Sequence, residues 1–217
     1  MSRYHLLVFD WDGTLSDSAA LIVRSIQRSA EDLSLPVPTD AQASYIIGLG
    51  LIDAMKHLFP GLAEEFYPKV ADRYRVHWMV GYRDVVLFPG VEAGLRQLKE
   101  RGYQLAVATG KSRKGLDTAL EQTGLASLFD RSRCADEGMP KPHPEMLFYL
   151  LEAFGTDAAD ALMIGDTTHD LDMATAAGVD GLAVCYGAHP AEQLSTAQKV
   201  HCIDTPAGLW TWLSENA

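Results

Sequence analysis

Two aspartates stand directly after a short apolar run near the start of the chain, in the sequence LLVFDWDGT (6–14). A carboxylate in the position of Asp10, at the end of a buried strand, can act as a nucleophile that forms a covalent intermediate. Asp12 shares the side of Asp10 in an extended chain, so it can serve as general acid and then as general base. Neighbouring anions favour the protonated form that the first step requires. The same short segment, taken alone, would also fit a capped loop.

Other polar residues follow later apolar runs or lie in loops between them. They are Thr109 and Gly110 in TGKS (109–112), Lys141 in KPHP (141–144), and Asp166 and Asp170 in GDTTHD (165–170). The Thr109 hydroxyl can donate to a phosphoryl oxygen, or else cap the following helix. Lys141 supplies a positive charge that offsets the anions around it. Asp166, Asp170 and Asp10 offer the carboxylate oxygens that Mg2+ prefers.

The elements that position these residues follow an alternating pattern. Short runs rich in Val, Leu and Ile predict buried strands over 5–9, 104–109, 161–165 and 181–185. Helical periodicity follows or separates them over 91–102, 113–124, 145–155 and 170–178. This order is typical of an α/β fold with a parallel sheet flanked by helices on both faces. Because ligands bind at the carboxyl ends of such strands, we expect the scattered motifs to form one site.

Residues 16–84 interrupt this rhythm and contain only helical patterns, over 18–33, 39–48 and 62–80. We therefore predict a catalytic core of residues 1–15 and 85–217 and a helical cap of residues 16–84, joined by hinges near 15–18 and 82–88. Packing of these helices as part of one body is the alternative. Candidate substrate-selecting residues in the cap are Gly48, Leu49 and Gly50 in YIIGLGL (45–51), together with Arg24, Tyr45 and Lys56. An ordinary turn between helices would also explain the two glycines.

The four motifs DWDGT, TGKS, KPHP and GDTTHD, in this order, resemble those of the haloacid dehalogenase superfamily, in its Mg2+-dependent phosphatase branch. The resemblance covers the whole chain and is greatest to phosphoglycolate phosphatases with a type 1 cap. It implies a Rossmann-like core, an aspartyl-phosphate on Asp10, and Asp12 as the acid–base group. It also implies that the phosphate is bound by Gly13, Thr109, Gly110 and Lys141. It further implies that Mg2+ is held by Asp10, the Asp12 carbonyl and Asp166, and that Asp170 either binds the ion through water or orients Lys141.

Other enzymes with the same fold differ from phosphatases in the motif residues that they need. A haloacid dehalogenase needs neither Asp12 nor GDTTHD, and a phosphonoacetaldehyde hydrolase needs a cap lysine closer to Gly48 than Lys56 is. A β-phosphoglucomutase-like enzyme keeps all four motifs, so it stays an alternative. A non-catalytic binding or regulatory protein is the alternative of another class, and retention of every motif acid argues against it.

The composition of the chain limits which classes of partner it is expected to bind. The net charge of −11 argues against a general nucleic-acid or anionic-membrane surface, and apolar residues make up an ordinary 47%. We find no apolar run of about 18 residues and no leader pattern, so we expect no membrane span and a cytoplasmic protein. The expected partner is a small phosphorylated metabolite, and the chain is a monomer or a dimer. Cys134, Cys185 and Cys202 are expected to be reduced thiols.

Several residues near the motifs are expected to lie outside the chemistry. Lys111 is expected at the surface because the GxxxxGKS spacing of a phosphate-binding loop is absent. His169 and Asp172 are expected to be solvated. Trp11 points away from the two acids at strand period, so we expect it against the core or the cap hinge. Asp17 is expected to cap the first cap helix.

Overall fold

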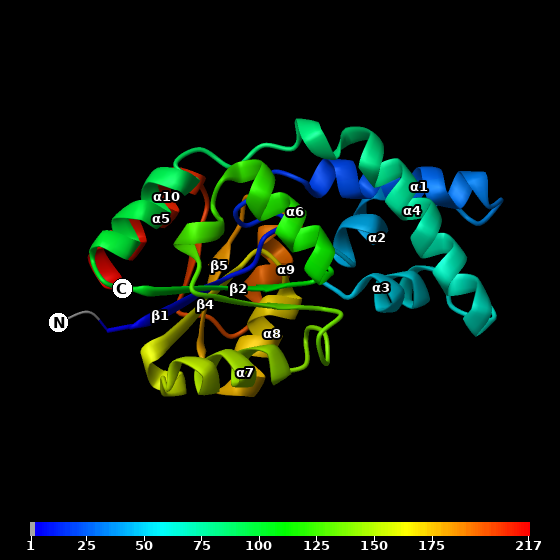
Figure 1. The fold of residues 1–217 in the computed structure, drawn as a ribbon. Helices are drawn as coiled ribbons and strands as arrows, with labels where there is room; N and C mark the ends of the chain where they lie inside the picture. Colours follow the sequence, from blue (N-terminus) through cyan, green and yellow to red (C-terminus); the bar gives the residue numbers. More distant parts are fainter. Residues whose placement is uncertain (1–2) are drawn as a thin grey trace.

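The computed structural model describes residues 3–217, and it confirms the α/β fold. Within these residues, a parallel sheet of six strands has the order β3-β2-β1-β4-β5-β6. The strands are β1 Leu6–Phe9, β2 Gln104–Thr109, β3 Arg131–Cys134, β4 Ala161–Gly165, β5 Asp180–Val184 and β6 His201–Ile203. Because β1 pairs with both β2 and β4, its carboxyl end lies beside theirs (Figure 1).

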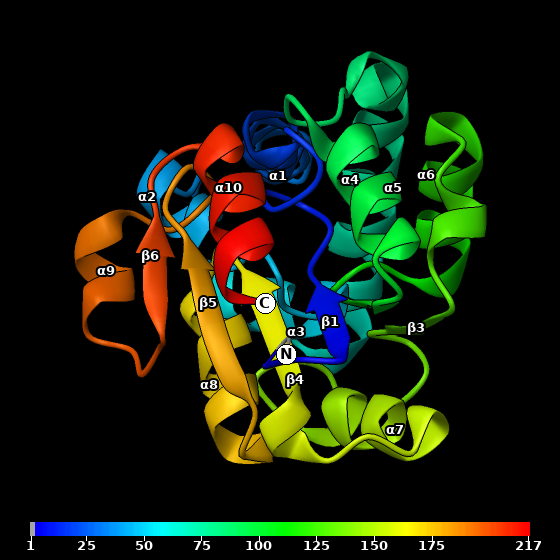
Figure 2. The same ribbon diagram turned by 90° about the vertical axis from the view of Figure 1, so that its left-hand side faces the viewer.

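Helices cover both faces of the sheet. Alternate residues of β1 point to opposite sides: Leu7 and Phe9 pack towards α5, α6 and α10, and Leu6 and Val8 pack towards α7 and α8 (Figure 2). These helices are α5 Val91–Glu100, α6 Arg113–Thr123, α7 Glu145–Phe154, α8 Thr168–Ala177 and α10 Pro206–Asn216, and a short α9, Ala191–Ser195, precedes β6. All the apolar side chains of β1 are therefore buried, which explains its unbroken apolar sequence.

The interior strands and their helices lie where the sequence predicts them, but the two edge strands do not follow from the sequence. β3 reads RSRC and β6 has only three residues, so neither gives an apolar run. An edge strand is paired on one side only and is partly exposed, which removes the apolar signal that marks an interior strand. Trp11 is buried in the core and packs edge-on against Phe129, as expected.

The insertion between β1 and α5 is helical, as predicted. It consists of α1 Ala19–Asp32, α2 Asp40–Tyr45, α3 Leu51–Leu58 and α4 Tyr67–Gly81, and α3 was not predicted. We call residues 16–84 the cap. The cap has its own buried cluster, which includes Ile26, Met55 and Val70, and it lies beyond the carboxyl ends of the strands (Figure 1).

The two chain segments that lead into and out of the cap lie side by side. Ser16 and Leu87 form an antiparallel bridge, the Asp17 N–H donates to the Val86 carbonyl at 2.9 Å, and the Phe88 N–H donates to the Leu15 carbonyl at 2.9 Å. The expected capping role of Asp17 is wrong: its side chain is exposed, and the N-cap of α1 is Ser18.

The expectation of three reduced thiols is also wrong. Cys185 follows β5 and Cys202 lies in β6, and the two are joined by a disulfide. The pairing of β5 with β6 brings them together, and this contact could not be foreseen because β6 was not predicted. Cys134 is free and buried, as expected. Among the described residues, no helix is both long and apolar enough to cross a membrane.

Candidate active site

Three buried aspartates meet at the carboxyl edge of the sheet. Asp10 follows β1, Asp166 follows β4, and Asp170 lies in the first turn of α8. One carboxylate oxygen of each lies within 4.8 Å of the other two, and the side chains are at most 1% exposed. The register Phe9↔Ile164 between β1 and β4 places Asp10 and Asp166 at the same level. The structure thus brings these sequence-predicted acids into one cluster.

Lys141 is the positive charge inside this cluster. Its ammonium nitrogen lies 2.7 Å from Asp10 Oδ1 and donates to Asp170 Oδ1 at 2.6 Å, and the side chain is fully buried. Burial acts to lower the pKa of Lys141, but the two carboxylates outweigh it, so the pKa is raised and the lysine stays charged. Burial raises the pKa of Asp10 to about 7, although Lys141 acts against this rise.

The turn after Asp10 is shaped around Asp166. Gly13 has a φ of +82°, and a Cβ at this position would lie 2.1 Å from Asp166 Oδ2, so only glycine fits. The Thr14 hydroxyl donates to Asp166 Oδ1 at 2.8 Å, and the Ala188 N–H donates to Oδ2 at 2.7 Å. Burial, together with the charges of Asp10 and Asp170, raises the pKa of Asp166 well above its ordinary value. The two hydrogen bonds from Thr14 and Ala188 fix the orientation of the Asp166 carboxylate.

Asp170 has both oxygens engaged by the protein. Oδ1 accepts from Lys141, and Oδ2 accepts from the Thr167 hydroxyl at 2.7 Å and the Thr167 N–H at 3.1 Å. The second pair of contacts belongs to a capping box at the start of α8. A Cβ on Gly165 would lie 2.3 Å from Asp170 Cγ, so this strand end must also be glycine. Asp170 is built to hold Lys141.

Asp10, unlike Asp170, makes no hydrogen bond through either of its carboxylate oxygens. In the described part of the chain, the buried side-chain polar atoms without a hydrogen bond are Asp10 Oδ1 and Oδ2, Arg133 Nε and Trp210 Nε1. The 2.7 Å approach of Lys141 to Asp10 Oδ1 is an ion pair without hydrogen-bond geometry. A buried carboxylate without hydrogen bonds is costly unless another group binds it. A hard cation fits this donor set of buried carboxylate oxygens.

Asp12 lies at the mouth of the cluster, with its side chain 12% exposed. Its Oδ1 accepts from the Ser18 hydroxyl at 2.7 Å and from the Lys111 ammonium at 2.9 Å. The surface position predicted for Lys111 is therefore wrong. Its ammonium lies 4.6 Å above the ring of Trp78, which belongs to the cap, and only 12% of its side chain is exposed. The sequence alone could not show that the cap covers TGKS, so it could not show that Lys111 would be enclosed.

Thr109 and Gly110 form the wall where β2 ends. Thr109 is buried, and its hydroxyl accepts from the Lys111 N–H at 3.2 Å. The alternative role of Thr109 as a helix N-cap is wrong, because Ser112 caps α6. A Cβ on Gly110 would lie 2.5 Å from the Gly48 carbonyl oxygen and 2.6 Å from that of Leu49. The cap loop thus rests directly on the glycine that follows Thr109.

Comparison with known proteins identifies the family. The sequence profile of the haloacid dehalogenase-like hydrolases matches residues 7–184, a range that includes Asp10, Asp12, Thr109, Lys141, Asp166 and Asp170. This chain belongs to the haloacid dehalogenase-like hydrolases.

Individual relatives of this hydrolase cover nearly its whole length. It is 39% identical over 208 residues to a probable phosphatase, IndB, of Dickeya dadantii, covering 92% of this chain and 89% of the relative. It is 32% identical to a phosphoglycolate phosphatase of Aliivibrio fischeri, covering 89% of each. The crystal structure of a predicted phosphatase from Clostridium acetobutylicum superposes with a TM-score of 0.87 at 27% identity, covering 99% of this chain and 100% of that one.

The cap of this hydrolase is held to the core by a contact that sequence reasoning missed. His169 is not solvated as expected but buried, and its Nε2 donates to the Tyr45 carbonyl at 2.8 Å. His189 Nε2 donates to the same carbonyl at 2.9 Å, and its Nδ1 accepts from the Thr168 N–H at 3.1 Å. Burial lowers the pKa of both histidines, so the neutral form is favoured. Asp172 is exposed, as expected.

A cavity of about 690 Å³ lies between core and cap and reaches Asp10, Asp12 and Thr109. Gly48, Leu49 and Gly50 line it, as the sequence predicts. Of the weaker candidates, Arg24 is exposed and Lys56 pairs with Glu64 on the surface. Tyr45 contributes its carbonyl to the histidine contact. On the cap side, the cavity is lined by residues 46–55, which include the start of α3, and by side chains of α1 and α4.

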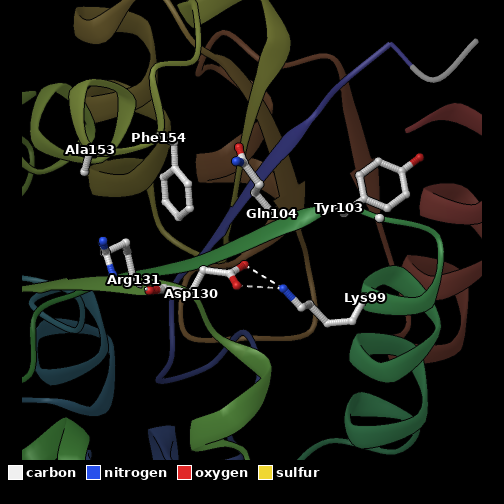
Figure 3. A pocket seen from close by; sticks show the side chains of 8 residues that line it. Lys99, Tyr103, Gln104, Asp130, Arg131, Ala153 and Phe154 are labelled. Atoms are coloured by element: carbon white, nitrogen blue, oxygen red, sulfur yellow. Dashed lines mark hydrogen bonds and ion pairs between the residues drawn. The ribbon is translucent and has the colours of Figure 1, made fainter.

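A smaller pocket of about 360 Å³ lies at the opposite edge of the sheet, where β2 and β3 begin (Figure 3). Lys99 donates to both carboxylate oxygens of Asp130 at 2.7 Å there, and the remaining wall includes Tyr103 and Phe154. Asp130 there is paired with Lys99 and partly exposed, whereas the Asp10 carboxylate at the carboxyl edge is buried and makes no hydrogen bond.

Proposed function

We propose that this hydrolase is a Mg2+-dependent phosphatase that cleaves a small phosphomonoester through an aspartyl-phosphate on Asp10. The observation that carries the proposal is the buried Asp10 carboxylate, which has no hydrogen bond and faces a cavity that also contains Asp12, Thr109 and Gly110. The phosphatase and phosphoglycolate phosphatase names of the relatives support the same reaction class. Phosphoglycolate is accordingly one candidate substrate.

The metal site in this proposal uses the residues expected from the sequence. Mg2+ would be held by Asp10, the Asp12 carbonyl and Asp166. Asp170 would contribute by holding Lys141 in position. When bound, the ion neutralises charge on the transferring phosphoryl group and aligns it for attack. The buried carboxylate cluster fits this ion because its oxygens are hard ligands and only one lysine offsets their charge.

The protein groups would divide the remaining work. Asp10 attacks phosphorus, and Asp12 gives a proton to the leaving oxygen and later takes one from the attacking water. Lys141, the Thr109 hydroxyl and the backbone at Gly13 and Gly110 stabilise the phosphoryl oxygens. Ser18 and Lys111 both contact Asp12 Oδ1, so they fix the orientation of the acid and leave Oδ2 to carry the proton.

The division into parts is also a proposal. Residues 1–15 and 85–217 form the catalytic core, and the cap of residues 16–84 opens to admit substrate and closes to exclude water from the intermediate. The paired segments at 15–17 and 86–88 would act as the hinge. The cytoplasmic location expected from the sequence stays a prediction.

Mass spectrometry and steady-state kinetics test this function together. With a generic phosphate ester and Mg2+, the wild type should release inorganic phosphate, and Asp10→Asn should show no turnover and no adduct. With p-nitrophenyl phosphate, whose leaving group needs no proton, Asp12→Asn should accumulate a phosphorylated peptide that contains Asp10, because water is no longer activated. Metal-dependent turnover in Asp10→Asn would contradict the covalent mechanism. Transfer of phosphate to a second position of a sugar phosphate, instead of release, would indicate the mutase alternative.

A further inference from the structure

The cap wall of the active-site cavity is largely apolar and aromatic. Its cap side chains include Ile22, Ile26, Tyr74, Trp78, Met79 and Tyr82. The two isoleucines also belong to the buried cluster of the cap, so this wall is continuous with a packed interior. A substrate group that lies against it would gain from the removal of apolar surface from water.

Two aromatic rings stand next to each other on this wall. Tyr74 and Trp78 are four residues apart on α4, so they share one face of the helix, and their rings stack at a centroid distance of 6.4 Å and an interplanar angle of 21°. Both rings line the cavity that reaches Asp12, and the Lys111 ammonium that pairs with Asp12 at 2.9 Å lies 4.6 Å from the Trp78 ring. The rings are therefore near the proposed acid–base group, which must meet the leaving group of a bound ester.

The cationic side chains that line the cavity are largely committed to other partners. Lys111 pairs with Asp12, Arg75 pairs with Asp72, and Lys114 lies on the exposed rim. Lys141 is enclosed by Asp10 and Asp170. On the described lining, Lys114 is the cation without an ion pair, and it lies at the rim. A second anionic group held next to Asp12, such as the carboxylate of glycolate, would therefore have to share an already paired cation, whereas an uncharged ring needs none.

The size of the cavity points in the same direction. Its volume of about 690 Å³ falls within the range of roughly 300–1,000 Å³ that is usual for sites of drug-sized ligands. A two-carbon acid would fill only a small part of it. A ring on the leaving group would reach from the phosphoryl position to Tyr74 and Trp78.

We infer, on the basis of the phosphatase function proposed above, that the preferred substrate is the phosphomonoester of an alcohol that carries a planar, largely apolar ring. The ester O–P bond breaks as Asp10 bonds to phosphorus, and the alcohol leaves with the proton of Asp12. Water then hydrolyses the aspartyl-phosphate, so the products are the ring-bearing alcohol and inorganic phosphate. Trp78 and Tyr74 determine specificity by stacking against the ring.

The test compares esters whose leaving groups are all simple alcohols. Benzyl phosphate, ethyl phosphate and phosphoglycolate are assayed with Mg2+, and kcat/KM for benzyl phosphate should exceed the other two by roughly tenfold or more, the scale that a filled apolar pocket provides. Trp78→Leu keeps apolar bulk but removes the ring, so it should lower the ratio of benzyl to ethyl phosphate efficiency. Trp78→Phe should retain most of the ratio. Val80→Ala, on the exposed side of α4, is the matched control.

The outcomes separate the two proposals. Equal or better hydrolysis of phosphoglycolate or ethyl phosphate, or an unchanged ratio in a folded Trp78→Leu variant, would overturn the inference and leave the phosphatase function intact. Failure to hydrolyse any of the three esters, or full activity in Asp10→Asn, would overturn both. Circular dichroism of each variant shows whether it is folded, and Trp78→Phe provides the comparison if the leucine variant is not.

Discussion

The ammonium of Lys141 lies 2.7 Å from Oδ1 of Asp10, inside a cluster from which solvent is excluded. An isolated buried carboxylate would take up a proton, and a protonated Asp10 could neither attack phosphorus nor hold a cation. The lysine is itself held by Asp170, which is held in turn by the capping box of α8. The proposed nucleophile thus depends, through Lys141 and Asp170, on the contacts at the beginning of α8.

Replacing Lys141 by Met should lower kcat by roughly 100-fold or more, because the variant loses a preorganised charge at the phosphoryl group. The acidic limb of the pH–rate profile should also move to higher pH, because the ion pair that favours ionised Asp10 is gone. Steady-state kinetics between pH 5 and pH 9 measures both effects. Lys99→Met, which removes the surface pair with Asp130, is the control and should leave kcat unchanged. An unshifted profile would mean that Lys141 does not govern the ionisation of Asp10.

Mg2+ binding should strengthen as pH rises through about 7, where Asp10 loses its proton in the metal-free protein. Because the pKa values of Asp10 and Asp166 are raised, both bind protons that a cation must displace, and acid therefore competes with the metal. Isothermal titration calorimetry at pH 6 and pH 8 should give roughly a tenfold lower Kd at pH 8 for each proton displaced. A Kd that is the same at both pH values would contradict the participation of these acids.

Gly110→Ala should keep the cap from closing. Its Cβ would meet the backbone oxygens of Gly48 and Leu49 at 2.5 and 2.6 Å, and the backbone on both sides leaves no flexible group to give way. We expect kcat/KM to fall by roughly 100-fold, as for other small displacements of reacting groups. Small-angle scattering should show a larger radius of gyration. Gly115→Ala, in the first turn of α6 on the same cavity, is the control, because its Cβ would come no closer than 3.3 Å to another atom, the Ser112 hydroxyl oxygen. A closed cap in the Gly110 variant would contradict the expectation.

The contact of His189 with Tyr45 should make the folded protein sensitive to acid. The folded-state pKa of His189 lies below the unfolded value of about 6.5, so its stabilising contribution is complete above that value and is lost as pH falls towards the folded pKa. His189→Ala should cost about 1–3 kcal/mol at pH 7.5, since the Thr168 N–H loses its acceptor. Urea unfolding at pH 7.5 and pH 5 should show that the variant loses less stability on acidification than the wild type. An identical loss in both proteins would assign the acid sensitivity to other groups.

Much of the fold was predictable because its interior strands are buried on both faces. The run ALMIG, for example, admits few other interpretations, and the acid that follows it must then lie at the edge of the sheet. Glycine at positions 13 and 165 also had a physical reason that could be anticipated, and the structure shows carboxylates occupying the space that a side chain would need.

What could not be predicted depends on contacts between distant segments. Lys111 and His169 stand in polar motifs next to turns, which usually indicates solvent exposure. His169 is buried and Lys111 is mostly buried because the cap lies over them, through the Tyr45 carbonyl for His169 and through Trp78 for Lys111. A sequence shows that a cap exists through its helical periodicity, but not which core residues it covers. The same limit applies to Cys185 and Cys202, which meet only through the pairing of two strands.

The hydroxyl of Ser18 has a consequence for the timing of the reaction. It donates to Asp12 Oδ1 at 2.7 Å, and Ser18 is the N-cap of the cap helix α1. Lys111 donates to the same oxygen, and its ammonium lies over the ring of Trp78 in α4. Movement of the cap would therefore loosen both supports of the acid at once. Asp12 would then be oriented to deliver its proton only while the cap is closed. The ester would therefore be protected from attack until its leaving group had been enclosed.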